Sequence, residues 1–120
     1  TPEFLQEAGI VAVRDGEDPV AAMAELCRVG RDAASRRLAD MPRVIYNPPA
    51  AAFYAFFKVD GMENSLEFAK RLALEYKVGV APGTAFGPSG EGWLRLCFAQ
   101  SPERIDEAMN RLAQALDEGV

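Results

Sequence analysis

The chain has 120 residues, with 13 lysines and arginines against 18 aspartates and glutamates, and so a net charge of −5. This length suits one domain, and a composition of 49% apolar and 26% charged residues excludes a largely disordered chain. The acidic balance argues against a nucleic-acid-binding domain, which would carry a basic patch.

The histidine and cysteine content excludes further kinds of catalytic and metal site. The chain has no histidine, which removes the commonest general base, the commonest metal ligand and the Ser-His-Asp arrangement. Cys27 and Cys97 lack CxxC spacing, and we expect free thiols in a reducing, cytoplasmic compartment, with a disulfide as the less favoured alternative. No apolar run reaches the roughly 18–20 residues that cross a bilayer, so we expect no membrane partner. Without histidine and without CxxC spacing we also expect no metal site. The start, Thr1-Pro2-Glu3-Phe4, has no Met and no basic-then-apolar signal, so we expect a chain entered partway along.

Two helices are predicted in the first third. Residues 1–14 mix apolar and polar side chains and predict a short helix with indistinct ends. Asp18 as N-cap and Pro19 as first helical residue predict a second helix that runs through Ala39. Gly30 weakens the interior of that helix.

Two more helices carry clear start signals. Asn64 and Glu67 have capping-box spacing, which predicts a helix from Ser65 to about Tyr76. Ser101-Pro102-Glu103 predicts the start of the last helix. Its apolar stripe has i, i+3, i+4, i+7 spacing: Ile105, Ala108, Met109, Leu112, Ala115 and Leu116.

Short apolar segments between the helices predict strands at residues 43–46, 53–59, 78–81 and 93–99. The predicted class is α+β, with about three helices covering a small, partly antiparallel sheet of about four strands. We expect the aromatic group Phe53, Tyr54, Phe56 and Phe57 in the core, and Lys58, Lys70 and Lys77 at the surface.

Arg95 is the first candidate for function. Residues 93–99 alternate, so Leu94 and Leu96 share one face and Trp93 and Arg95 the other. An arginine keeps its charge, and among apolar neighbours it needs an anionic partner. The partner is either an internal carboxylate or the carboxylate or phosphate of a ligand, which the planar guanidinium binds with two hydrogen bonds.

Residues 82–92 are the second candidate. The segment is rich in glycine, but it has no GK[ST] and leads into a strand, so neither a P-loop nor a Rossmann turn fits. The simpler interpretation is an ordered connection between two strands that lies over a site beside Arg95.

The run Val80–Ala99, VAPGTAFGPSGEGWLRLCFA, resembles the C-terminal signature of the class I/II aminotransferases, the aspartate-aminotransferase-like enzymes of fold type I that use pyridoxal phosphate (PLP). Four other segments resemble the family in the right order: residues 1–13 (F-x-Q-x-A), 30–38 (R-R-D), 49–54 (P-x-G-A-F-Y) and 101–112 (E-x-x-x-E-A-x-x-R-L). The resemblance covers nearly the whole chain.

This resemblance implies that residues 1–120 form the C-terminal small domain of such an enzyme, without its N-terminal, cofactor-binding large domain. It implies that Arg95 binds the α-carboxylate of an amino-acid substrate. The residues implied to support that site are Gly83, Thr84, Phe86 and Gly87.

The same resemblance implies a dimeric parent that transfers an amino group between an α-amino acid and a 2-oxo acid. The family's PLP-binding lysine lies upstream of the segment that residues 1–13 match, so we expect no catalytic residue here, no tight PLP binding and no activity of this chain alone. Ala51 replaces a family glycine, and an alanine at positive φ would be strained.

Two alternatives stay open. One is a stand-alone binding or regulatory module that holds a small carboxylate with Arg95 and the glycine-rich loop. The other is a related fold type I synthase or decarboxylase that shares this domain. The residues of this chain do not specify which amino acid the parent would accept.

Overall fold

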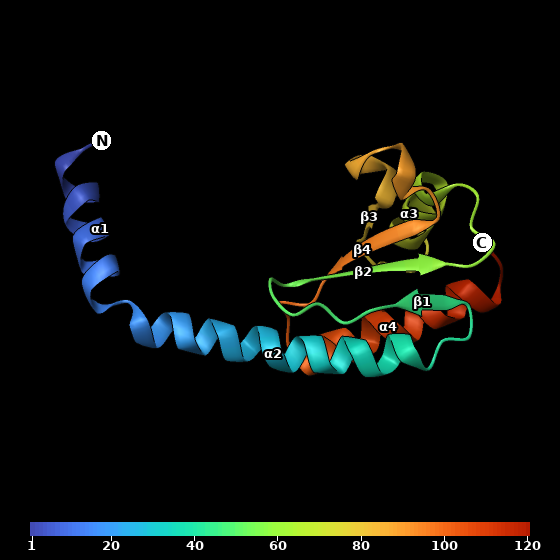
Figure 1. Ribbon diagram of the computed structural model, residues 1–120, viewed down its shortest axis with the longest axis horizontal. Coiled ribbons are helices and arrows are strands. Elements are labelled where there is room, and N and C mark those ends of the chain that lie inside the picture. Colours follow the sequence, from blue (N-terminus) through green and yellow to red (C-terminus); the bar gives the residue numbers. More distant parts are fainter.

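A projecting helical arm and a body of sheet and helices make up the computed structural model, which describes residues 1–120. Helix α1 (Glu3–Asp15) and the first half of α2 (Glu17–Ala39) form the arm, and the second half of α2 lies along the body (Figure 1). The radius of gyration is 17.2 Å, whereas a compact chain of this length has about 14 Å. The arm therefore accounts for the 53 Å length of the molecule.

The sheet has four strands in the order β1-β2-β4-β3, and every neighbouring pair is antiparallel. The strands are β1 (Val44–Tyr46), β2 (Tyr54–Val59), β3 (Ala81–Pro82) and β4 (Trp93–Cys97). The predicted α+β class with a small sheet is confirmed. The strand predicted at 78–81 is wrong except for Ala81, since β3 consists of Ala81 and Pro82, and the strand predicted at 93–99 ends two residues earlier.

Burial alternates strictly along the two central strands, and this decides which face of the sheet meets the helices. Ala55, Phe57 and Val59 of β2 are buried, as are Leu94 and Leu96 of β4. They share one core with residues of α2, of α3 (Ser65–Leu74) and of α4 (Pro102–Asp117), among them Leu38, Phe68, Leu72, Ile105, Met109 and Leu112. The other face carries Tyr54, Phe56, Lys58, Trp93, Arg95 and Cys97, and we call it the open face.

Two of the three predicted helix caps are confirmed. The Asn64 side chain accepts a hydrogen bond from the Glu67 amide at 3.1 Å, and Ser101 Oγ accepts one from the Arg104 amide at 3.5 Å. The capping box is only half formed, because the Glu67 carboxylate binds Lys70 instead. These local signals place the first turns of α3 and α4 correctly.

The predicted cap at Asp18 is wrong. Helix α1 continues to Asp15, and Gly16 alone separates it from α2, so Gly16 holds the cap position and Asp18 lies inside the first turn. Asp18 still acts favourably there, because a carboxylate near a helix N-terminus offsets the positive end of the helix dipole.

Gly30 is explained by packing. A Cβ at this position would lie 2.0 Å from the Phe98 carbonyl oxygen, so only glycine lets α2 approach the chain that leaves β4. The helix continues unbroken through this residue. The close approach packs α2 against the segment that follows β4.

The arm exposes an unusual amount of apolar surface. No residue of α1 is buried, and Val13 is 89% exposed. The other exposed apolar side chains of the arm are Phe4, Leu5, Ile10, Val11, Val20 and Met23. An isolated helix of about 12–15 residues is marginal in water, and α1 buries none of its residues against the body of the chain. None of the helices combines the length and the apolar character that a bilayer crossing requires.

Neighbouring leucines of α3 provide a test of the core. Leu72 is fully buried and Leu74 is 71% exposed. We expect Leu72→Ala to lower the free energy of unfolding by about 2–5 kcal/mol, because it leaves a cavity. Leu74→Ala, the matched control, changes it by about 0.5 kcal/mol or less. Urea unfolding followed by the fluorescence of the single tryptophan, Trp93, measures both; equal losses would contradict the assigned core.

Candidate functional site

Arg95 lies in the middle of β4, at the centre of the open face. It stands opposite Phe56 of β2 and Ala81 of β3. Its side chain is half-buried, yet it makes no salt bridge and no hydrogen bond within the chain. The one buried side-chain nitrogen without a partner is Arg71 Nε, so the Arg95 donors reach solvent. The internal carboxylate partner, one of the two interpretations of the sequence, is not present.

Aromatic rings take the place of that partner. The Arg95 guanidinium carbon lies 4.2 Å from the ring centroid of Tyr54 and 4.2 Å from that of Phe86. Phe56 stacks on Trp93 at 4.9 Å and meets Phe86 edge-to-face at 6.1 Å. The open face thus carries a continuous group of rings around one cation.

The expectation that the four aromatic residues at 53–57 form core is wrong for three of them. Phe57 is fully buried, but Phe53 and Phe56 are exposed and Tyr54 is half-buried on the open face. Strand alternation is the reason for Tyr54 and Phe56, since residues one apart point to opposite faces. Phe53 lies before β2 begins, directly after the positive φ of Ala52, so the alternation does not apply to it. Trp93, which the sequence leaves undecided, also lies on the open face and is half-buried.

The glycine-rich loop folds into two short 3₁₀ turns, η1 (Gly83–Phe86) and η2 (Pro88–Gly90). A Cβ on Gly83 would lie 2.2 Å from the Gly90 carbonyl oxygen, so the two turns pack backbone against backbone. Gly87 joins them at φ 129°, a conformation that side chains disfavour. The amides of Gly87, Gly90 and Glu91 bond to carbonyls within the loop, which leaves them unavailable to cradle a phosphate.

Glu91 pins this loop to helix α3. Its Oε1 accepts hydrogen bonds from the amide of Ser65 at 2.6 Å and from that of Gly92 at 3.0 Å. Thr84 Oγ1 adds a contact of 3.5 Å to Ser65 Oγ. The hydrogen bonds that Glu91 accepts lower the pKa of its carboxyl, and the bond from the Ser65 amide is the largest cause. Sequence analysis missed Glu91, because the helix amide that it binds lies 26 residues away.

Each residue predicted to support the site therefore has a defined structural position. Gly83 allows the two turns to cross, Thr84 contacts α3, Phe86 contacts Arg95, and Gly87 supplies the left-handed link. The loop brings Phe86 over β4, and no other part of the chain places a ring there from outside the sheet.

Backbone strain in the connector before β2 lies one residue later than expected. Ala52, not Ala51, has a positive φ, at 64°. An alanine in this region is disfavoured by contact of its Cβ with the backbone. The strained residue leads into Phe53, whose carbonyl accepts a hydrogen bond from the Phe98 amide at 2.9 Å and so anchors the start of β2.

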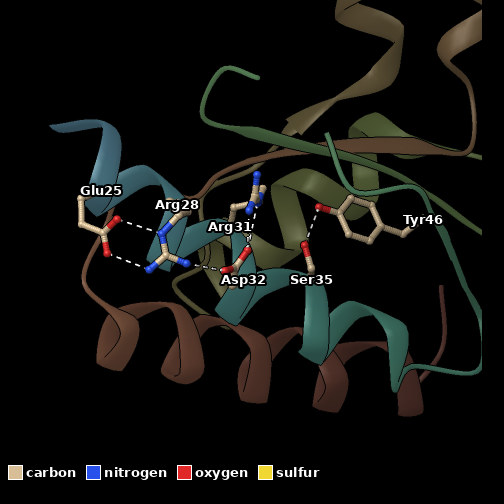
Figure 2. Close-up of polar contacts among 6 residues, drawn as sticks. All are labelled: Glu25, Arg28, Arg31, Asp32, Ser35 and Tyr46. Atoms are coloured by element: carbon tan, nitrogen blue, oxygen red, sulfur yellow. Dashed lines mark hydrogen bonds and ion pairs between the residues drawn. The ribbon is translucent and has the colours of Figure 1, made fainter. Parts of the chain in front are cut away.

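A second group of arginines lies on α2 and differs in its partners. Arg28 binds Glu25 through two hydrogen bonds, at 2.7 and 2.8 Å, and Asp32 at 3.0 Å (Figure 2). Arg31 also binds Asp32, and its hydrogen bond is the largest cause of the lowered pKa of that carboxyl. Arg28 and Arg31 line a depression of about 670 Å³ and are both paired, unlike Arg95. Arg36 lines the same depression but is exposed.

The remaining candidates lie at the surface. Lys58, Lys70 and Lys77 are all exposed; Lys70 pairs with Glu67, and Lys77 binds the Leu74 carbonyl at the end of α3. The thiols of Cys27 and Cys97 are free. No group of histidine, cysteine, aspartate or glutamate side chains is arranged to hold a metal ion.

The hydrogen bonds to Glu91 predict that the stability of the fold depends on pH. A carboxyl whose folded-state pKa is lowered stabilises the fold above its unfolded pKa of about 4.3, and the contribution disappears as the pH falls through the lowered value. We expect Glu91→Gln to lower the thermal unfolding midpoint at pH 7 and the difference from wild type to shrink below about pH 4. Glu63→Gln, an exposed carboxylate that makes no hydrogen bond, is the control; a difference constant with pH would contradict the assignment.

Comparison with known proteins identifies the family of this chain. A family profile described as "Aminotransferase class I and II" matches residues 1–112. The aspartate aminotransferase of Pyrococcus horikoshii is 40% identical over 117 residues, which cover 95% of this chain and 30% of that protein. The chain thus spans about a third of the length of this relative.

Solved structures show the same fold. The aromatic aminotransferase of Pyrococcus horikoshii matches with a TM-score of 0.78 and 31% identity, over 88% of this chain and 28% of that one. A PLP-dependent aminotransferase from Streptococcus suis matches with a TM-score of 0.87 over 98% of this chain and 31% of that one; at 21% identity, this likeness concerns the fold alone. Since the family profile spans nearly all of its residues, the chain belongs to the class I and II aminotransferases.

Proposed function

We propose that this chain is the C-terminal small domain of a PLP-dependent aminotransferase and that Arg95 binds the α-carboxylate of its substrates. The observation that carries the proposal is a half-buried guanidinium on the open face with no carboxylate partner in its own chain. A guanidinium presents its N–H donors in one plane, in a fork that matches a carboxylate with two parallel hydrogen bonds.

One arginine serves both substrates of the proposed reaction. An α-amino acid and a 2-oxo acid differ at the α-carbon but share the neighbouring carboxylate, so the same two hydrogen bonds hold either one. Holding the carboxylate fixes the orientation of the α-carbon, and positioning of this kind supplies a large part of the lowering of a reaction barrier. When PLP is bound in the parent enzyme, it supplies the electron sink for this chemistry.

The surface around Arg95 is open in this chain, which supports a site that another part of the protein completes. Arg95 lines none of the five depressions described on the surface, so a carboxylate bound to this chain alone would remain open to water. The apolar side chains of the arm are exposed as well. We propose that the large domain of the same polypeptide covers both, in a cytoplasmic homodimer. Exposed apolar patches of this extent typically mark interaction surfaces.

The residues of this chain do not fit PLP by themselves. The three lysines are exposed, and the amides of the glycine-rich loop are used within the loop. We therefore propose that the residues that hold PLP belong to the large domain and that this chain alone is inactive.

Replacement of Arg95 in the full-length parent tests the carboxylate role. We expect Arg95→Ala to lower kcat/KM for the amino-acid substrate about 100-fold or more, because two charge-assisted hydrogen bonds are lost. Arg95→Lys keeps the charge without the planar fork and should fall between wild type and Arg95→Ala. Arg104→Ala, which removes an exposed arginine with no ion pair, is the control; unchanged kinetics of Arg95→Ala would refute the role.

Titration of this chain with PLP tests the cofactor proposal. We expect no visible absorbance band that persists on dialysis, because no lysine is buried next to a group that would hold the cofactor. A persistent band that disappears on replacement of Lys58, Lys70 or Lys77 would contradict the proposal. Full-length parent treated in the same way is the positive control.

A further inference from the structure

Two rings from separate parts of the chain contact the Arg95 guanidinium. Tyr54 comes from β2, the strand next to β4, and Phe86 comes from η1. Each ring centroid lies 4.2 Å from the guanidinium carbon. A cation this close to a ring is attracted by the negative potential of the ring face.

These contacts attract the charge without using its N–H donors. Arg71 provides a comparison within the same chain, since it also lies over two rings, Phe68 at 5.2 Å and Tyr76 at 5.8 Å. The Arg71 donors, however, bind the carbonyls of Ala115 and Gly119 and tie α3 to the end of α4. Arg95 lies closer to its rings and makes no such bond, so its donors remain free for a ligand.

Phe86 is held in place although it is 51% exposed. It meets Phe56 edge-to-face at an angle of 87°, and Phe56 stacks on Trp93 at an angle of 14°. The loop that carries Phe86 is in turn pinned to α3 by Glu91. These contacts fix the position of the Phe86 ring, which is too exposed to be held by burial alone.

We propose that Tyr54 and Phe86 are positioning residues that hold the Arg95 guanidinium with its donors directed to a carboxylate ligand. This inference rests on the proposed function of Arg95. A free arginine side chain loses rotamer freedom when it binds, and holding it beforehand reduces that cost. Rings suit this task better than an internal carboxylate, because a carboxylate would occupy the same donors and have to be displaced.

The test uses the full-length parent and an unreactive probe, propionate, as an inhibitor against the amino acid that the parent accepts. We expect Phe86→Leu and Tyr54→Leu each to raise the inhibition constant of propionate about three- to tenfold, because leucine keeps apolar bulk but has no ring face. Phe86→Tyr and Tyr54→Phe keep the ring and should restore the constant to within about twofold of wild type. Propionamide, which lacks the charge, should inhibit all variants equally.

Arg95→Ala separates the two proposals. If Arg95→Ala weakens propionate inhibition and the leucine variants do not, the positioning role is wrong and the carboxylate role stands. If Arg95→Ala also has no effect, the proposed function itself is wrong. Thermal unfolding of each variant reports on folding; Phe86 is half exposed in a loop, so Phe86→Leu decides the question even if Tyr54→Leu unfolds.

Discussion

Five residue pairs join β2 to β4, from Tyr54 opposite Cys97 to Lys58 opposite Trp93. Because side chains alternate along a strand, this register decides at once which residues enter the core and which remain on the open face. A slip of one residue in β4 would turn Arg95 toward the core and turn Leu94 and Leu96 away from it. The burial of Phe57, Leu94 and Leu96 thus holds Arg95 on the open face, so the core and the candidate site depend on the same strand pairing.

Three arginine environments in one small chain show how partners determine the role of a guanidinium. On α2, Arg28 and Arg31 bind carboxylates at the surface, where such pairs contribute little stability. Arg71 binds backbone carbonyls at the end of α4 and joins two helices. Arg95 has ring faces beside it and free donors. Only the last arrangement leaves both charge and hydrogen-bonding capacity for a molecule from outside the chain.

The asymmetry of the sheet gives the chain two surfaces of different kinds. Helices cover one face completely, whereas the open face and the projecting arm leave apolar and aromatic side chains in water. The chain spans about a third of the length of its Pyrococcus horikoshii relative, and exposed apolar surface of this extent is typical of an interaction surface. The loop that Glu91 joins to α3 carries Phe86 and so lies beside Arg95 on that open face.

Signals that act within a few residues were sufficient to predict the caps at Asn64 and Ser101, the stripe of α4 and the alternation that isolates Arg95. The exception among them, Asp18, failed because the preceding helix runs on to Asp15. Only the tertiary structure showed the contacts between distant segments: the crossing of Gly83 and Gly90, the bond from Ser65 to Glu91, and the rings around Arg95. It also showed the positive φ of Ala52. The alternation of a strand tells which side an arginine faces, but what it meets there depends on where a loop and a neighbouring strand are brought by the packing of the whole chain.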